Sequence, residues 1–264
     1  MTVVAVVAIG LIAGLLANRY LRPRVMADDE EGSSVRDLIS PMETLTVLLL
    51  AFVLVVAADS FDDADDAADA EAEVLDHMSE VAVYLPEPQR QQLLGQVTCY
   101  ARAISQLEWM TMREGSVSRV ARVWSTAFRQ PIGEIADDEP LLFEILIAAD
   151  KERSERRGRR LSEAVPAIPN VIFLFMLLTL AATVMGFAFS LPRVRNGTQI
   201  LTLLLLAGLF TLSLLLIRDV DRPFEGLVSI PPTAMLDTAE DVAAEYVTDY
   251  GPNRFPCDDL GQPI

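Results

Sequence analysis

The sequence predicts an all-α membrane protein, with four transmembrane helices in two hairpins that flank a helical cytoplasmic domain. Of its 264 residues 52% are hydrophobic, yet the formal net charge is −17, so apolar and charged residues must occupy different segments. Four apolar stretches approach the roughly 20 residues that a helix needs to cross a bilayer. Between the second and the third, apolar residues recur every three or four positions, which is typical of amphipathic helices, and strand-like alternation is not evident anywhere.

These segments divide the chain into four parts. We expect residues 1–58 to form the first transmembrane hairpin and residues 59–168 to form the helical domain, which begins acidic and ends basic. Residues 169–218 would form the second hairpin, and residues 219–264 a cytoplasmic tail.

The chain is organised around one long helix, which we expect from Glu43 to Leu85. Its first part, Thr44–Ala58, is apolar, and it passes without Gly or Pro into an acidic run. That run consists of Asp59, Asp62, Asp63, Asp65, Asp66, Asp69, Glu71, Glu73 and Asp76. Because carboxylates are costly to place against hydrocarbon, they must face water, another subunit or a pore.

The first apolar stretch, Thr2–Ala17, is followed by three arginines before position 25. A signal peptide carries its positive charge before the apolar run and a small-residue cleavage site after it, so we expect an uncleaved span here. Val25–Ser40 is interpreted as a solvated loop. Pro41 then lies where the start of a helix tolerates proline, and it opens the long helix.

Amphipathic helices are expected throughout the middle domain. After the prolines that end the long helix, one apolar stripe consists of Leu93, Val97, Tyr100, Ile104 and Leu107. Ser116 is expected to cap a third helix, Val117–Arg129, and a fourth helix begins at Leu141 and turns basic toward its end. The side chains that we expect to pack the domain include Glu108, Trp109 and Trp124.

The second hairpin contains the clearest spans, Asn170–Leu191 and Thr198–Ile217. Between them, Asn196-Gly197-Thr198 matches a glycosylation triplet, but it lies so close to lipid that we interpret it as a turn. A short helix is expected in the tail near Thr238–Val247.

The orientation rests on basic residues near the membrane. One side holds Arg19, Arg22, Arg24, Arg36, Arg193 and Arg195. The other side holds Lys151, Arg153, Arg156, Arg157, Arg159, Arg160, Arg218 and Arg222. The positive-inside rule favours the larger group in the cytoplasm, which places both termini and the middle domain inside a cell or inner membrane.

Composition also argues against several functions. An acidic chain lacks the positive footprint that nucleic acid requires, and Cys99 and Cys257 do not make a disulfide framework. There is no Gly-rich phosphate loop, HExxH, Gly-x-Ser-x-Gly or Cys–His pair, so we expect no enzyme activity, cofactor or metal. His77 lies one helical turn from Glu73 and Glu80, and a solvated histidine is the preferred interpretation over a metal ligand.

Four short motifs resemble those of the bestrophin-like family of bacterial membrane proteins, over roughly residues 40–232. They are Leu49-Leu50-Ala51-Phe52, Leu85-Pro86-Glu87-Pro88, Arg159-Arg160-Leu161 and Asp221-Arg222-Pro223-Phe224-Glu225-Gly226. The resemblance implies a distant likeness to bestrophins, which are homopentameric ion channels whose second span lines the pore and continues into a cytoplasmic helical vestibule. In animal bestrophins an acidic Ca²⁺-binding cluster follows the fourth span. Here the dense acid follows the second, so Ca²⁺ gating is not implied.

With the long helix on a five-fold axis, one stripe of that helix becomes a candidate pore lining. The stripe consists of Leu45, Leu49, Phe52, Val56 and Asp59. An apolar ring can gate a pore by dewetting, and we predict the constriction at Leu49, Phe52 and Val56. The alternative is that the stripe faces lipid or a neighbouring helix.

The acidic run gives a second candidate feature. A ring of carboxylates favours cations, and the ring residues that we predict are Asp59, Asp62, Asp63 and Asp66. This would give a preference for monovalent cations, although anion conduction is the default suggested by bestrophins. The alternative is a solvated helix face.

The remaining motif residues are predicted to be structural. We expect Arg159 and Arg160 at the lipid headgroups or paired with Asp221, and the turn at Asp221, Arg222, Pro223 and Phe224 to fix the exit of the fourth span through a local salt bridge. Two functions remain open, namely an oligomeric ion channel and a non-conducting scaffold whose helical domain binds another protein.

Overall fold

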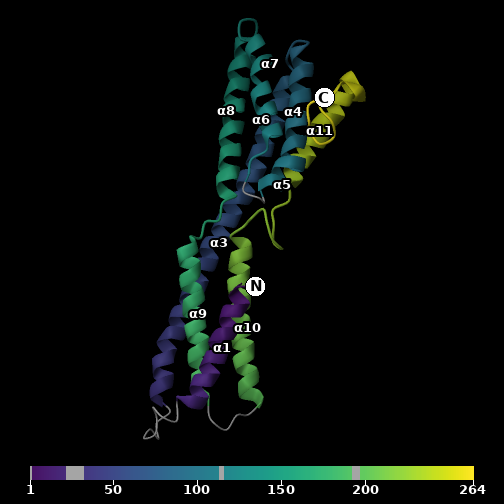
Figure 1. Cartoon of the computed structure of the whole chain (residues 1–264). Coiled ribbons are helices and arrows are strands. Elements are labelled where there is room, and N and C mark those ends of the chain that lie inside the picture. The colour runs from purple at the N-terminus through teal and green to yellow at the C-terminus, as the bar shows by residue number, and fades with distance from the viewer. Residues whose placement is uncertain (1, 22–32, 113–115, 192–196) are drawn as a thin grey trace. The chain divides into compact units, whose positions relative to one another are not determined.

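The computed structural model (Figure 1) describes residues 2–21, 33–112, 116–191 and 197–264. The regular secondary structure in these ranges is helical, and the extended pairing in them is an isolated antiparallel bridge between Cys257 and Pro263. The all-α class predicted from the sequence is therefore confirmed. The helices are α1 (Thr2–Tyr20), α3 (Ser33–Ala82), α4 (Gln89–Arg102), α5 (Trp109–Met112), α6 (Arg119–Ala127), α7 (Arg129–Glu134), α8 (Pro140–Glu163), α9 (Asn170–Ser190), α10 (Gly197–Val220) and α11 (Thr233–Tyr250), with a π-helical segment η1 (Ala103–Glu108) and a 3₁₀ turn η2 (Pro252–Arg254).

The chain forms two compact units. The first, the membrane unit, comprises Met1–Asp59 and Pro166–Asp221, and the second, the helical unit, comprises Ser60–Val165 and Arg222–Ile264. Helix α3 contributes residues to both units. Four helices, namely α1, α3, α9 and α10, are long and apolar enough to cross a membrane.

In the membrane unit, α1, α9, α10 and the first part of α3 run lengthwise beside one another (Figure 1). Most of their apolar side chains point away from the unit, as is expected for helices that face lipid. The buried minority forms a core of Val3, Val7, Leu50, Val53, Ala57, Ile168, Met176, Leu177, Leu180, Val184, Ala207, Leu214 and Ile217.

Two glycines allow α1 to approach α9 closely. A Cβ atom on Gly14 would lie 2.4 Å from the carbonyl oxygen of Met185, and one on Gly10 would lie 2.9 Å from that of Ala181. This Gly-x-x-x-Gly spacing is typical of membrane helices whose backbones touch. At the end of the contact, the Asn18 amide donates to the carbonyl oxygens at Ala188 (3.1 Å) and Leu191 (2.9 Å).

Polar contacts also fix α3 and the ends of the second hairpin. The hydroxyls of Thr46 and Thr183 lie 2.8 Å apart in the buried interior, joining α3 to α9. Before α9, the backbone N–H of Ile168 donates to an Asp221 carboxylate oxygen at 2.9 Å. Both contacts satisfy polar groups that lipid cannot satisfy.

Helix α3 begins earlier than the sequence analysis predicted. It starts at Ser33, so part of the segment expected to be a loop is helical, and Pro41 lies inside the helix rather than at its start. The rest of that expected loop, residues 25–32, lies outside the described residues. Past Pro41 the helix is uninterrupted to Ala82, close to the predicted end.

One face of α3 is buried along nearly its whole length. One series of its buried residues continues at steps of three and four, with half-buried Ser60 completing it; the series consists of Thr46, Leu50, Val53, Ala57, Ala64, Ala68, Glu71, Leu75, Met78 and Ala82. This spacing keeps a single stripe of a helix in contact with its neighbours. The opposite face of α3 is therefore open in both units.

The helical unit packs α4, η1, α6, α7, α8 and α11 with the second part of α3 around an apolar core. Ser118, not Ser116, caps α6, since its hydroxyl accepts from the N–H of Ala121. The stretch predicted as one helix to Arg129 is divided between α6 and α7, and α11 is longer than the predicted tail helix. Helix α11 packs along α4 (Figure 1).

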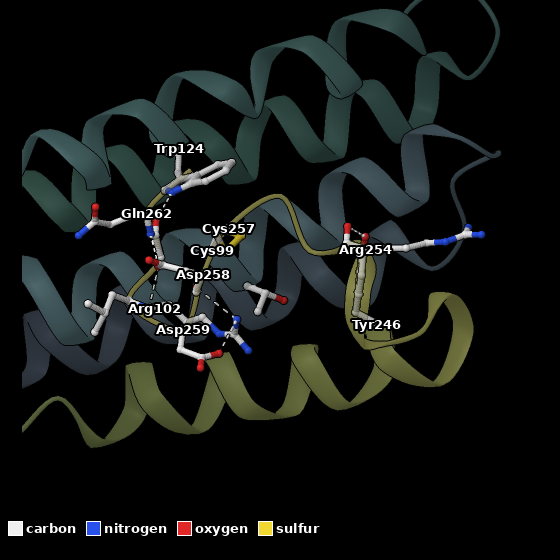
Figure 2. The surroundings of a disulfide bond; sticks show 12 residues. Cys99, Arg102, Trp124, Tyr246, Arg254, Cys257, Asp258, Asp259 and Gln262 are labelled. Carbon is white, nitrogen blue, oxygen red and sulfur yellow. Dashed lines mark hydrogen bonds and ion pairs between the residues drawn. A yellow bond between two sulfur atoms is a disulfide. The ribbon is translucent and has the colours of Figure 1, made fainter. Parts of the chain in front are cut away.

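The tail after α11 is folded onto the helical unit, and Cys99 and Cys257 form a disulfide (Figure 2). The sequence analysis expected no disulfide framework from two cysteines, and it missed this single bond between residues 158 positions apart. Close by, the Trp124 indole N–H donates to the carbonyl oxygen of Gly261 at 2.6 Å. Gly261 has φ +77°, and a Cβ there would lie 2.5 Å from the backbone nitrogen of Ala103, so only glycine fits.

The glycine contact of the membrane unit gives a first prediction. We expect Gly14→Ala to lower the stability of the protein by about 1–3 kcal/mol, because the added methyl forces α1 away from α9. The measurement is the temperature at which heated, detergent-purified protein ceases to elute as a single species in size-exclusion chromatography. Gly208→Ala in α10 is the matched control, since its Cβ would meet no atom within 4 Å. Equal midpoints for the two variants would contradict the close packing.

Candidate functional site

The predicted pore stripe lies mostly on the open face of α3. The side chains of Phe52 and Val56 are 69% and 38% exposed, and Asp59 is exposed at the end of the apolar part. Leu49 differs from them because it is half-buried and packs against the core of the membrane unit. Phe52, Val56 and Asp59 are thus free to face lipid, another subunit or water.

The predicted ring residues are exposed as well, and one of them has a partner. Asp62, Asp63 and Asp66 all lie on the outer surface of α3. The guanidinium of Arg159 on α8 lies 3.1 Å from a carboxylate oxygen of Asp63. Because both side chains are about half exposed, solvent screens this pair and it contributes little to stability.

Behind this surface lies a network of buried charges that joins α3, η1 and α8. Arg160 is fully buried, and its Nε donates to Glu71 at 2.7 Å while its Nη2 donates to Glu108 at 2.8 Å. Both carboxylates are fully buried too. Arg157 completes the site by contacting both oxygens of Glu108, at 3.0 and 2.5 Å.

Tyr100 extends the network across α4. Its hydroxyl donates to the second oxygen of Glu71 at 2.7 Å and accepts from Arg153 at 2.9 Å. Arg153 also pairs with Asp150 at 2.6 Å and lies over the rings of Tyr100 and Phe128, 4.8 and 4.9 Å from their centroids. Three guanidinium groups therefore balance the carboxylates of Glu71, Glu108 and Asp150, and the network is electrically neutral.

The pKa shifts in the network follow from these contacts. Burial alone would raise the pKa of Glu108, but the hydrogen bonds from Arg157 and the charge of Arg160 outweigh it and lower the pKa below the usual range. Burial, followed by the charge of Glu71, raises the pKa of Tyr100 well above its usual value. Burial would lower the pKa of Arg160, yet the neighbouring carboxylates raise it. All of these groups therefore keep their ordinary charge states at neutral pH.

Helical periodicity places Glu71, Arg153 and Arg160 on buried stripes. Glu71 lies in phase with the buried Ala64, Ala68 and Leu75 of α3, and Arg153 and Arg160 continue the stripe of Leu146 and Ala149 on α8. The π-helical turn of η1 leaves Leu107 partly exposed and buries Glu108, four positions after Ile104. Such π-bulges commonly shift the register of a helix in this way.

These positions correct two sequence-based predictions. Arg160 was expected at the lipid headgroups or beside Asp221, but it is buried in the helical unit because Glu71 and Glu108 bind it. Arg159 lies on the surface of the same unit and pairs with Asp63. The network itself was missed, although a carboxylate in phase with alanines and two arginines in phase with Leu146 were visible signals.

The Asp-Arg-Pro-Phe segment is held by ring packing, backbone hydrogen bonds and a local ion pair. Phe224 is buried with its ring edge-on to Trp109, at a centroid distance of 5.3 Å. The indole N–H of Trp109 donates to the carbonyl oxygen of Ile230 at 3.0 Å, and the N–H of Ile230 donates to that of Pro223 at 2.8 Å. The local ion pair of the segment joins Arg222 to Glu225, at 2.9 Å.

His77 is exposed and lies 3.8 Å from Glu80, and in the part of the chain that the structure describes no group of His, Cys, Asp and Glu is arranged to hold a metal. The buried network has its charges paired internally. Its chemistry is therefore that of an anchor between helices, whereas the open stripe of α3 has its side chains exposed.

Comparisons with known proteins agree with this architecture. A family model described as the bestrophin-like domain matches residues 3–235. Solved structures with the same fold include a bacterial bestrophin homologue from Klebsiella pneumoniae phased with zinc, with TM-score 0.70 and 12% identity, covering 93% of this chain and 98% of that one. Two single-substitution variants of that protein give TM-scores of 0.71 and 0.72 at 11% and 12% identity; they cover 96% and 94% of this chain and 100% of theirs. No curated protein matches the sequence.

The buried network gives a second prediction. We expect Arg160→Gln to destabilise the helical unit by about 3–5 kcal/mol, because Glu71 and Glu108 would remain buried without their shared cation. Thermal unfolding followed by tryptophan fluorescence measures this directly, since Trp109 and Trp124 are the two tryptophans of the chain and both lie in this unit. The matched control is Arg156→Gln on the same helix, whose exposed pair with Glu152 contributes about 0.5 kcal/mol. A midpoint for Arg160→Gln that equals the control would show that the network is dispensable.

Proposed function

Because the chain belongs to the bestrophin-like family, we propose that it is an ion channel of a bacterial inner or plasma membrane, formed by several copies of the chain around a common axis. The bestrophin fold of the whole chain and its four membrane-crossing helices support this function. The observation that carries the proposal is the open face of α3, where an apolar stripe is followed without a break by exposed carboxylates.

Helix α3 is the proposed pore lining. Its buried face is occupied by contacts within the subunit, so its other face is available to line an axis. Phe52 and Val56 are the residues best placed to narrow such a pore by excluding water, and Leu49, which is half-buried, would support them from the side. Such a constriction would be a closed or nearly closed gate made of apolar side chains.

The acidic run is the proposed basis of ion preference. Carboxylates repeated around an axis raise the local cation concentration and exclude anions. Asp59, Asp62 and Asp66 are exposed, and Asp63 is partly offset by Arg159. A preference for monovalent cations follows, because no cluster in the described residues has the arrangement that would hold a divalent metal tightly.

We further propose a homopentamer that sits in membrane lipid. Closed rings are the usual form of oligomers built from one head-to-tail contact, and the family resemblance implies five copies. The exposed apolar side chains of the four spans supply the surface for lipid and for neighbouring subunits. The sequence-based orientation, with the termini and the helical unit in the cytoplasm, rests on eight basic residues against six.

A scaffold function remains the alternative, and one observation favours it. A hollow on the helical unit is lined largely by apolar side chains, among them Leu107, Met110, Val117 and Val120. Such a surface could receive another protein without any ion flow. The exposed carboxylates after the apolar stripe of α3 have no role in that function, so we favour the channel.

Recordings from the purified protein in a planar bilayer under a KCl gradient test the channel. We expect a reversal potential displaced toward the K⁺ equilibrium value, and a smaller displacement for the variant with Asp→Asn at positions 59, 62, 63 and 66. Asp137→Asn/Asp138→Asn is the control, since these exposed carboxylates lie far along the chain from α3. Reversal at the chloride value would defeat the cation preference, and reproducible absence of conductance would favour the scaffold.

The subunit number has its own test. The chain has a mass of 29.0 kDa, and native mass spectrometry in a mild detergent is expected to show a species of five chains. Monomers alone across several detergents would exclude a pore on a subunit axis. Rings of another size would leave the channel in place and correct the number of subunits.

A further inference from the structure

The disulfide of the helical unit bears on the side of the membrane that this unit occupies. Cys99 on α4 and Cys257 in the tail are both almost fully buried, and Figure 2 shows the tail lying across α4 at this point. Around the bond, Tyr246 donates to the carbonyl oxygen of Arg254 at 2.7 Å, and the Arg102 guanidinium lies 4.8 Å from the centroid of the Phe255 ring. The disulfide therefore lies in a packed contact between the tail and α4, and the folding of the tail brings the two sulfur atoms together.

Disulfides of this structural kind form and persist in oxidising compartments, whereas the cytoplasm keeps thiols reduced. A cytoplasmic helical unit would therefore hold two free, buried thiols in place of the bond.

A second observation is independent of the first and concerns the basic residues. The positive-inside rule applies to short connections, because long domains cross the membrane largely regardless of their charge. The connection between α3 and α9 includes most of the helical unit, so its arginines should not be counted. The short connections and flanks carry Arg19, Arg22, Arg24, Arg36, Arg193 and Arg195 on one side, against Arg218 and Arg222 on the other.

The structure explains why the arginines of α8 do not act as membrane-side anchors. Arg153 and Arg160 are buried and Arg157 contacts the buried Glu108, so these three belong to the internal network. Arg156 is partly exposed and pairs with Glu152, and Arg159 is exposed and pairs with Asp63. The arginines of α8 are numerous because they pack and pair within the helical unit. Without them, the side of the membrane that holds the helical unit no longer has more basic residues than the other side.

We propose that the helical unit lies on the extracytoplasmic, oxidising side of the membrane, and that the two short connections, α1–α3 and α9–α10, face the cytoplasm. With four spans, the chain order puts both short connections on one side and the whole helical unit on the other. This reverses the orientation predicted from the sequence. In the proposed channel, the acidic run of α3 would then meet cations from outside the cell.

The first experiment measures the redox state of the native chain. Cells expressing it are quenched with acid, denatured with N-ethylmaleimide to block free thiols, then reduced and treated with a 5 kDa polyethylene-glycol maleimide. A disulfide leaves both cysteines protected from the first reagent, so we expect a two-step gel shift in most molecules. Absence of the shift would mean that the thiols are free in the cell, and it would overturn the proposal.

The second experiment places the unit directly, using single added cysteines in the otherwise native protein. Lys151→Cys reports on the helical unit, since the Lys151 side chain is 78% exposed, and Thr198→Cys reports on the short connection before α10, where Thr198 is exposed. A membrane-impermeant maleimide applied to intact spheroplasts should label Lys151→Cys and spare Thr198→Cys until lysis. The opposite pattern would overturn the proposal. Both reporter variants are also made in a Cys99→Ala/Cys257→Ala background, which shows whether the labelling comes from the added cysteines and not from the native ones.

This topology test is separate from the channel test. A protein labelled as expected but electrically silent would retain the orientation and lose the channel, whereas a conducting protein labelled in the opposite pattern would do the reverse.

Discussion

The buried position of Arg160 between Glu71 and Glu108 is the constraint on which the helical unit depends. A guanidinium in an apolar core is tolerated only with carboxylates and hydrogen bonds around it, and here they come from Glu71 of α3, Glu108 of η1 and the Met112 sulfur of α5. Each contact fixes one helix: Glu71 sets the rotation of α3, Glu108 requires the π-helical turn, and Arg160 sets the depth of α8. Tyr100 and Arg153 extend the same constraint to α4 and to the ring of Phe128. The apolar core then fills the space that these charges define.

Helix α3 has a different constraint, because the same buried stripe must serve two surroundings. Thr46, Leu50 and Val53 suit the interior of a membrane bundle, where small or apolar contacts and one hydroxyl pair suffice. Beyond Ala64 the same stripe carries alanines, which let helices approach closely, and then the buried Glu71. The stripe repeats without a slip in register, so the open face carries Phe52, Val56 and the exposed aspartates in a fixed order. A helix with a break at the membrane boundary would not keep that order.

The sequence predicted much of this because helical periodicity is local. The four spans, the long helix and the amphipathic stripe through Leu93 and Val97 follow from spacing alone, and the fold class is confirmed. The rest depended on contacts between distant residues. Nothing near Arg160 shows whether it meets a headgroup or two carboxylates, and nothing near Cys99 indicates a partner 158 positions away. The available signal was the helical spacing of Glu71 and Arg160 relative to apolar residues on the same helix, and this spacing would have indicated that both are buried. The roles assigned to Leu49, Phe52, Val56 and the aspartates remain proposals.

Charge is divided in this protein between two populations with separate tasks. The buried network contains three carboxylates and three guanidinium groups, so it adds nothing to the net charge of −17. The whole of that excess belongs to groups outside the network, and the exposed acids of α3 are a dense part of it. Because low-dielectric surroundings strengthen the buried pairs while solvent screens the exposed charges, the first population determines whether the helices stay together. In the proposed channel, the second determines which ions approach. Substitutions in the buried network should therefore change the stability of the helical unit, whereas substitutions of the exposed acids should change its electrostatic effect on ions. The two properties can be measured independently.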